Sequence, residues 1–282
     1  FRDLFIQPAS SDEGIPLGCA LHGYYASGGR VRTVMETAYL GVANDPATVE
    51  EECQTWGLHS TQVTPKEIAE RLAAGKIIGR IAEACEYGPR ALGNRSILAD
   101  PRPADMKERL NTQIKHREGF RPFAPSCLEG NIPNFIDAPR NSPFMLLAGT
   151  VSVEGQRQVP AVVHADGTSR VQTVSRQHNT DYYNIIQAFY EATGCPILLN
   201  TSFNDRDEPI VETYDDAISC FLRTGLDGLL LEDRLIARDQ TTPVRDRSTL
   251  LANTQDRVEK EYRNLIARFC DMEAYVSLGE RL

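Results

Sequence analysis

Apolar residues recur at helical and strand spacing between residues 64 and 232, and their order predicts a mixed α/β sheet. One helix is expected to begin at Thr64, because Thr64-Pro-Lys-Glu67 supplies an N-cap hydroxyl, a proline at the first helical position and a capping-box carboxylate. The other elements are predicted from the period of their apolar positions. Helices are expected near Met106, from Thr180 to Gly194 and from Thr213, and strands at 76–81, 161–163, 171–174, 196–199 and 228–231.

The pattern changes toward both ends of the chain. Residues 1–30 mix Gly, Pro and Ser with short apolar pieces, and residues 41–60 are polar. Neither stretch predicts a core of its own. After Pro243, apolar residues at helical spacing among charged ones predict a last helix. We therefore expect the end of one domain in 1–45, a linker in 46–63, the main domain in 64–245 and a helical extension in 246–282.

Composition narrows the class of protein. The 282 residues carry a net charge of −9, which argues against broad binding of nucleic acids or anionic membranes. No run approaches the ~18 apolar residues of a membrane-spanning helix. The seven cysteines form no CxxC pair, which favours a reducing cytoplasm over a disulfide framework. The chain begins with Phe1 and has no signal segment, so we interpret it as a fragment.

Positive charge is concentrated where the rest of the chain is acidic. Residues 76–126 hold ten Lys or Arg against six Asp or Glu. Within this window Arg90, Lys115 and Arg121 stand among Gly, Pro and aromatic residues, a setting typical of guanidinium groups held at an anion site. Gly88 and Gly93 imitate the start of a P-loop, but Asn94 stands where that motif needs its Lys, so a P-loop is excluded.

Five segments resemble the O-carbamoyltransferases of the nodulation-protein and tobramycin-carbamoylation type, in the order of that family. They are Gln7-Pro-Ala-Ser-Ser-Asp-Glu-Gly14, Glu86-Tyr-Gly-Pro-Arg-Ala-Leu-Gly-Asn-Arg-Ser96, Arg117-Glu-Gly-Phe-Arg-Pro-Phe-Ala-Pro125, His164-Ala-Asp-Gly-Thr-Ser-Arg-Val-Gln172 and Leu199-Asn-Thr-Ser-Phe-Asn204. The resemblance implies a YrdC-like mixed α/β twisted sheet, preceded by the C-terminal remnant of an actin/hexokinase-like ATPase domain. It also implies that the missing N-terminal domain of the same protein is a partner of this part.

The resemblance implies an activity and its site residues. The YrdC-like part of such enzymes joins the carbamoyl group of carbamoyl phosphate to AMP from ATP, and the other domain passes it to a hydroxyl of a small-molecule acceptor. Arg90, Lys115 and Arg170 are then expected to act in catalysis. The residues expected to bind the substrate are Arg90, Lys115, Arg121, Arg170, Asn200 and Ser202. Without the first domain, the chain is not expected to complete the transfer.

The cofactors expected from the resemblance are ATP with Mg²⁺ and an iron-type metal. Asp12 aligns with a carboxylate that completes the metal site together with two His from near the start of such proteins. This sequence has no HxxxH pair. A turn-stabilising role is the alternative for Asp12. His164 is expected to be structural and His116 to lie at the surface.

Two other functions fit parts of the sequence. Enzymes that make threonylcarbamoyl adenylate for tRNA modification share the YrdC-like fold, but they start from threonine and bicarbonate. An RNA-binding module would use the basic window on a phosphate backbone, with Tyr87, Phe120 and Phe123 as stacking residues. The acceptor cannot be identified from these residues, since its pocket belongs to the missing domain.

Overall fold

The computed structural model describes residues 5–32, 34–131, 135–137, 141–239 and 242. All of them belong to one compact unit, residues 1–242. The second unit, residues 243–282, lies outside the described residues, and so does the helix predicted after Pro243.

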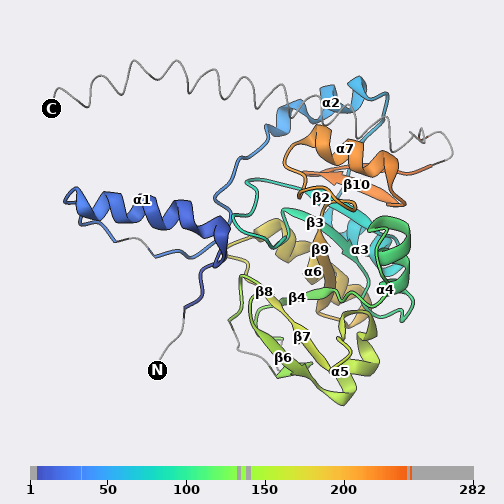
Figure 1. Cartoon of the computed structure of the whole chain (residues 1–282). Coiled ribbons are helices and arrows are strands. Elements are labelled where there is room, and N and C mark those ends of the chain that lie inside the picture. The colour runs from blue at the N-terminus through green and yellow to red at the C-terminus, as the bar shows by residue number, and fades with distance from the viewer. Residues whose placement is uncertain (1–4, 33, 132–134, 138–140, 240–241, 243–282) are drawn as a thin grey trace. The chain divides into compact units, whose positions relative to one another are not determined.

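Most described strands join one sheet (Figure 1). Within the described residues this sheet has eight strands in the order β1-β11-β10-β2-β3-β9-β4-β8, and a smaller sheet has the order β5-β6-β7. The strands of the large sheet are β1 (Thr61–Gln62), β2 (Ile78–Ile81), β3 (Arg95–Ala99), β4 (Ala124–Leu128), β8 (Gln172–Val174), β9 (Ile197–Ser202), β10 (Gly228–Leu231) and β11 (Arg234–Ala237). Those of the small sheet are β5 (Ile136–Asp137), β6 (Ala148–Val151) and β7 (Thr168–Arg170).

The sheet is mixed, as the sequence predicts. β10 pairs with β2 and β4 pairs with β8 in parallel, while the other neighbours run antiparallel. β3 and β9 lie at its centre, with Leu98 opposite Asn200 and Ser96 opposite Ser202. Buried strands in such a sheet are often continuous apolar runs, which explains why β9, with Ile197-Leu-Leu199, and β10, with Leu229-Leu-Leu231, were visible in the sequence, whereas β3, with Arg95 and Ser96, was not predicted.

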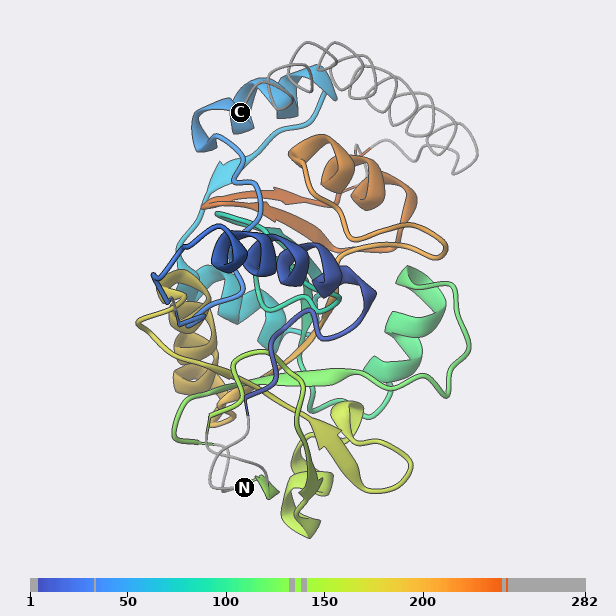
Figure 2. The ribbon, with the colours of Figure 1, turned by 60° about the vertical axis from the view of Figure 1, so that its left-hand side comes forward.

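Helices cover both faces of the sheet (Figures 1 and 2). α3 and α6 pack against each other on one face, and α7 lies across the sheet from them, against β10 and β2. The helices are α1 (Ile15–Ala26), α2 (Val49–Thr55), α3 (Pro65–Ala73), α4 (Met106–Arg109), α5 (Val153–Gln158), α6 (Thr180–Thr193) and α7 (Tyr214–Arg223). Shorter turns are η1 (Asp12–Gly14), η2 (Pro46–Thr48), η3 (Leu110–Ile114) and η5 (Pro160–Val162). No described helix is both long enough and apolar enough to cross a membrane.

The helix ends follow the sequence signals closely. The capping box of Thr64 and Glu67 is formed in α3. Thr213 caps α7 through a second capping box with Asp216. The N-cap of α6 is Asn179, one residue before the predicted cap Thr180, because the Asn179 side chain accepts the N–H of Tyr182. The helix ends at Gly194, which is in the left-handed region.

Two local predictions are wrong. Residues 161–163 form no strand, because Pro160 starts the 3₁₀ turn η5 and the N–H of Ala161 bonds to the carbonyl of Pro101. Asp166-Gly167 does make a tight turn, yet the two strands expected around it do not pair. β7 pairs with β6 instead, and β8 pairs with β4.

The region expected to be a linker is structured. In residues 46–63, α2 buries Val49 and Cys53, and β1 pairs with β11 at the edge of the large sheet. α1 is different, since it buries no side chain and projects from the sheet in Figure 1. Helix α2 and strand β1 therefore precede residue 64, where the main domain was predicted to start.

Candidate anion site

Arg90 and Arg170 come from distant segments and meet at one place, here called the arginine pair. Arg90 lies on the loop between β2 and β3, and Arg170 is the last residue of β7. Both side chains are half-buried, and the Nε of each is buried with no hydrogen-bond partner among the described residues. Burial, followed by the nearby charge of Arg90, lowers the pKa of the Arg170 guanidinium to about 10. Two cations held together without a carboxylate are suited to a dianion.

Lys115 lies in a second, polar cavity of about 220 Å³, here called the Lys115 pocket. It is lined by Lys115, Arg117, Glu118, Arg121, Ser202, Asn204, Asp205, Arg206 and Asp207. The ammonium group of Lys115 donates to the Ser202 carbonyl and hydroxyl oxygens and to the carbonyl and Oδ1 of Asn204, at 2.5 to 3.3 Å. Because the group is buried, its pKa falls to about 7.

The other cations of this pocket are more exposed. Arg121 pairs with Glu118 at 3.0 Å, and both side chains are 53% exposed. Arg117 stacks its guanidinium over the ring of Phe123, 4.8 Å from the centroid, and its Nε donates to Oδ1 of Asn111 at 2.7 Å. The structure therefore brings Lys115, Arg121 and Ser202 together, as the sequence analysis expected.

Strand β9 connects the pocket to the arginine pair. Asn200 and Ser202 are two residues apart, so their side chains share one face of the strand, roughly 7 Å apart. Ser202 accepts from Lys115, while the Nδ2 of Asn200 donates to the carbonyl of Ala91, next to Arg90. One extended ligand could thus contact both places.

Asn200 is more embedded than a simple ligand-binding residue. Its Nδ2 also lies within hydrogen-bond distance of Ser126 Oγ and Gln172 Oε1, at 2.9 and 3.1 Å. Its Oδ1 is buried and has no partner among the described residues. The amide nitrogen of Asn200 therefore holds the backbone at Ala91, and its amide oxygen is the atom left for a ligand.

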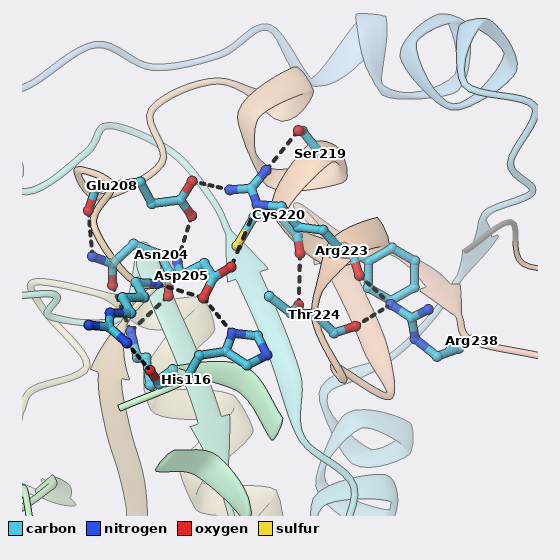
Figure 3. Close-up of polar contacts among 12 residues, drawn as sticks. His116, Asn204, Asp205, Glu208, Ser219, Cys220, Arg223, Thr224 and Arg238 are labelled. Atoms are coloured by element: carbon cyan, nitrogen blue, oxygen red, sulfur yellow. Dashed lines mark hydrogen bonds and ion pairs between the residues drawn. The ribbon is translucent and has the colours of Figure 1, made fainter. Parts of the chain in front are cut away.

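A buried polar network lies behind the Lys115 pocket (Figure 3). Oδ1 of Asp205 accepts from Nδ1 of His116 at 2.7 Å, and its other oxygen lies 3.8 Å from Nε of Arg223. Arg223 also pairs with Glu208 and donates to the hydroxyl of Ser219. His116, predicted at the surface, has a side chain that is 36% exposed and is fixed on one side by the buried carboxylate of Asp205.

The remaining sequence candidates, Asp12 and His164, do not line the Lys115 pocket. Asp12 is exposed in η1, and the described residues contain no group of three or more His, Cys, Asp or Glu that could hold a metal ion. They do not by themselves fit the iron-type site that the resemblance implies. His164 is half-buried, and its pKa is lowered first by burial, with Asp166 and Arg170 close by.

The sequence analysis did not assign three residues that the structure adds. Arg117 and Asn204 line the Lys115 pocket, and Glu86 holds the loop that carries Arg90. A signal for the first two was present, because Arg117 stands two residues after Lys115 and Asn204 two residues after Ser202, next to predicted site residues in the sequence. Glu86 gave no comparable signal.

Comparison with known proteins places this site in a family. The family described as "Carbamoyltransferase C-terminus" matches residues 69–238. Nodulation protein NolNO of Sinorhizobium fredii is 45% identical over 253 residues, which cover 86% of this chain and 37% of that protein. Nodulation protein NolO of Bradyrhizobium diazoefficiens is 43% identical over 263 residues, covering 90% and 48%.

Among solved structures, HypF in its phosphate- and nucleotide-bound form aligns with a TM-score of 0.40 at 16% identity, over 67% of this chain and 23% of that one. The chain spans less than half the length of the two nodulation proteins. The family match covers the loop of Arg90, the Lys115 pocket, Arg170 and β9. This chain belongs to the carbamoyltransferase family and carries the region described as its C-terminus.

Proposed function

We propose that this chain binds carbamoyl phosphate and ATP and forms carbamoyl adenylate. The rest of the enzyme would then transfer the carbamoyl group to a hydroxyl of a small-molecule acceptor, such as a natural product or a sugar. The family supports carbamoyl transfer. The intermediate, the acceptor and the assignment of residues are part of the proposal.

The observation that carries the proposal is the arginine pair. A carboxylate near Arg90 or Arg170 would mark a structural ion pair, but the buried Nε of each has no hydrogen-bond partner in the described chain. Each charge-assisted hydrogen bond to an anion contributes about 1.5–3 kcal/mol. Two converging guanidinium groups can therefore hold the phosphate of carbamoyl phosphate.

We assign the nucleotide to the Lys115 pocket. In the proposed reaction, water hydrolyses carbamoyl phosphate to carbamate and phosphate, and a carbamate oxygen then attacks the α-phosphorus of ATP and displaces pyrophosphate. Negative charge gathers at that phosphorus, and preorganised cations stabilise it. Lys115, Arg117 and Arg121 supply those cations, and Ser202 and Asn200 supply neutral hydrogen bonds along β9. Mg²⁺ would accompany ATP on its phosphates.

The metal proposed at Asp12 would serve the transfer step and not adenylate formation. Asp12 needs further ligands from outside the described residues, because it has no cluster of ligating side chains around it. We derive no step of adenylate formation from it.

Calorimetry tests the assignment directly. We expect the chain to bind carbamoyl phosphate, and Arg90→Ala and Arg170→Ala each to lower the affinity at least tenfold, in line with the loss of about 1.5–3 kcal/mol per charge-assisted bond. The control is Arg157→Ala, which removes an arginine that is 75% exposed on α5. The site would be refuted if the wild-type chain did not bind carbamoyl phosphate, or if both variants bound it as tightly as the wild-type chain does.

A second assay separates this function from the rival adenylate chemistry. Pyrophosphate release from ATP is measured with carbamoyl phosphate, and again with threonine plus bicarbonate. Release with carbamoyl phosphate alone is the expected result. Release that requires threonine and bicarbonate would favour the tRNA-modification route.

A further inference from the structure

The carboxylate of Glu86 fills a ring of backbone N–H groups in the loop that carries Arg90. Its Oε1 accepts from the N–H of Leu92 at 2.6 Å, of Asn94 at 2.8 Å and of Arg95 at 3.2 Å. Three N–H groups that point at one oxygen form an anion-binding concavity of the kind that holds phosphate in other proteins. Here the chain's own carboxylate occupies it.

The backbone of this loop can turn so tightly because of two glycines. Gly88 has a φ of +112° and Gly93 a φ of +123°, values that other residues rarely adopt. These are the two glycines that imitate a P-loop in the sequence. The loop has the phosphate-binding shape, but Glu86 takes the place of the phosphate.

Arg90 stands on the arch that Glu86 closes. The far side of the arch is fixed by other segments, since Asn200 donates to the carbonyl of Ala91, and Gln172 and the hydroxyl of Tyr39 donate to the carbonyl of Leu92. On the near side, Glu86 is the partner that the described residues offer to the three N–H groups, while Arg80 and Ser96 hold Gly93 between them. Without that carboxylate, the N–H groups would lose their partner and the arch would lose its closure.

We infer that Glu86 is a positioning residue for the ligand anion, acting in two ways. It fixes the backbone that presents Arg90 toward Arg170, and it occupies the N–H ring so that a phosphate group binds to the arginine pair and not inside the loop. The inference rests on the proposed function of the arginine pair. It assigns no contact between Glu86 and the substrate.

The test is chemical rescue of carbamoyl phosphate binding, measured by calorimetry. We expect Glu86→Ala to weaken binding at least tenfold. Formate at about 50 mM should restore at least part of the affinity, because its carboxylate can occupy the emptied N–H ring. In the wild-type chain, where Glu86 fills the ring, formate should only compete and lower the affinity. Each titration is repeated in sodium chloride of equal ionic strength.

Matched variants separate positioning from general loss of stability. Glu67→Ala removes another carboxylate that accepts a backbone N–H, at the start of α3, and should lower the melting temperature without changing affinity or responding to formate. Glu86→Gln keeps an oxygen in the ring but loses the charge, so we expect an intermediate loss of at least threefold. If Glu86→Ala does not fold, the affinity of Glu86→Gln for carbamoyl phosphate tests the role of Glu86.

The outcomes are distinct from those of the proposed function. If the wild-type chain does not bind carbamoyl phosphate, the arginine-pair assignment fails. If the wild-type chain binds it and folded Glu86→Ala binds equally well, or weakly with no response to formate, the role of Glu86 is overturned. Affinity of Glu86→Gln equal to wild type, with Glu86→Ala unfolded, overturns it as well.

Discussion

At the scale of single residues, Lys115 combines burial with a charge that the proposed chemistry needs. Its ammonium group donates to four oxygen atoms of Ser202 and Asn204, but no described carboxylate forms an ion pair with it. Desolvation brings its pKa from 10.5 to about 7. The free chain therefore loses this positive charge within the ordinary pH range.

This pKa predicts opposite effects of pH on nucleotide affinity and on stability. Above pH 7 a bound nucleotide must draw a proton onto Lys115, so affinity should fall with rising pH, by up to about tenfold per unit. The unfolded chain holds that proton up to its ordinary pKa of 10.5, so the contribution of Lys115 to folding stability should rise from pH 7 toward that value. ATP affinity and urea unfolding from pH 6 to 9 measure both.

The Lys115→Met variant should remove both pH dependences, while Lys66→Met, which changes an exposed residue of α3, should keep them. Proton uptake gives an independent measurement. At pH 8, the binding enthalpy of ATP should vary with the ionisation enthalpy of the buffer in the wild-type chain and in Lys66→Met, but not in Lys115→Met. A flat affinity profile in the wild-type chain would contradict the assignment of Lys115.

At the scale of elements, the loop of Arg90 is packed against α6. A Cβ atom added at Gly93 would lie 2.4 Å from the ring of Tyr182, which is fully buried in α6. The backbone at Gly93 is also in the region with positive φ. Gly93→Ala should therefore lower the free energy of unfolding by at least ~2 kcal/mol, through strain and overpacking together.

Urea unfolding of Gly93→Ala and Gly119→Ala checks this. Gly119 lies in a loop as well, but an added Cβ there meets no atom within 4 Å. We expect the Gly119 variant to stay within about 0.5 kcal/mol of the wild-type chain, the usual range for surface substitutions. Similar losses in the two variants would mean that contact with Tyr182 does not determine the cost.

A helix or strand could be predicted where the hydrogen-bond partners that define it lie close together in the sequence. The capping boxes of α3 and α7 lie within four residues of sequence, so the sequence contains all of their partners. The strand predicted at 161–163 is wrong because the N–H of Ala161 donates to the carbonyl of Pro101, a partner that no local pattern reveals. β11, which was not predicted, is a short edge-side strand that pairs with β1 and β10.

The same distinction applies to the site. Arg90 and Lys115 stand out because Gly, Pro and aromatic neighbours surround them in the sequence, whereas Arg80 and Arg95 of the same basic window are buried structural residues. Arg95 donates to backbone carbonyls such as that of Ala82, and Arg80 to that of Gly93. Only the folded loop shows that these two guanidinium groups already donate to backbone carbonyls, although the Nε of Arg80, like that of Arg90 and Arg170, is buried without a partner among the described residues.

At the scale of the whole molecule, the network behind the Lys115 pocket joins segments far apart in the chain. His116 follows the pocket lysine, Asp205 and Glu208 lie in the loop after β9, and Arg223 ends α7 (Figure 3). Arg223 and Asp205 are nearly inaccessible, with side-chain exposures of 2% and 1%. This network anchors α7 to the loop that forms one wall of the pocket.

Breaking this network should lower the free energy of unfolding more than breaking an exposed ion pair, because the charges of the network are buried. Arg223→Met would leave two buried carboxylates with one cation fewer, and we expect a loss of ~3 kcal/mol in the free energy of unfolding. Arg121→Met breaks the exposed pair with Glu118, for which about 0–1 kcal/mol is expected. Urea unfolding of both single variants measures the difference.

A double-mutant cycle then assigns the loss to the pair itself, because Arg223→Met also removes contacts of the side-chain stem. The cycle of Arg223→Met with Glu208→Gln should give a coupling free energy of at least ~1 kcal/mol, and the cycle of Arg121→Met with Glu118→Gln less than ~0.5 kcal/mol. Since Glu208 also accepts the N–H of Asp205 and its carbonyl accepts from Asn204, a side chain that contacts Lys115, the Arg223 variant should also weaken ATP binding. Equal coupling in the two cycles, with unchanged ATP affinity, would show that α7 is held to the sheet by its apolar face alone.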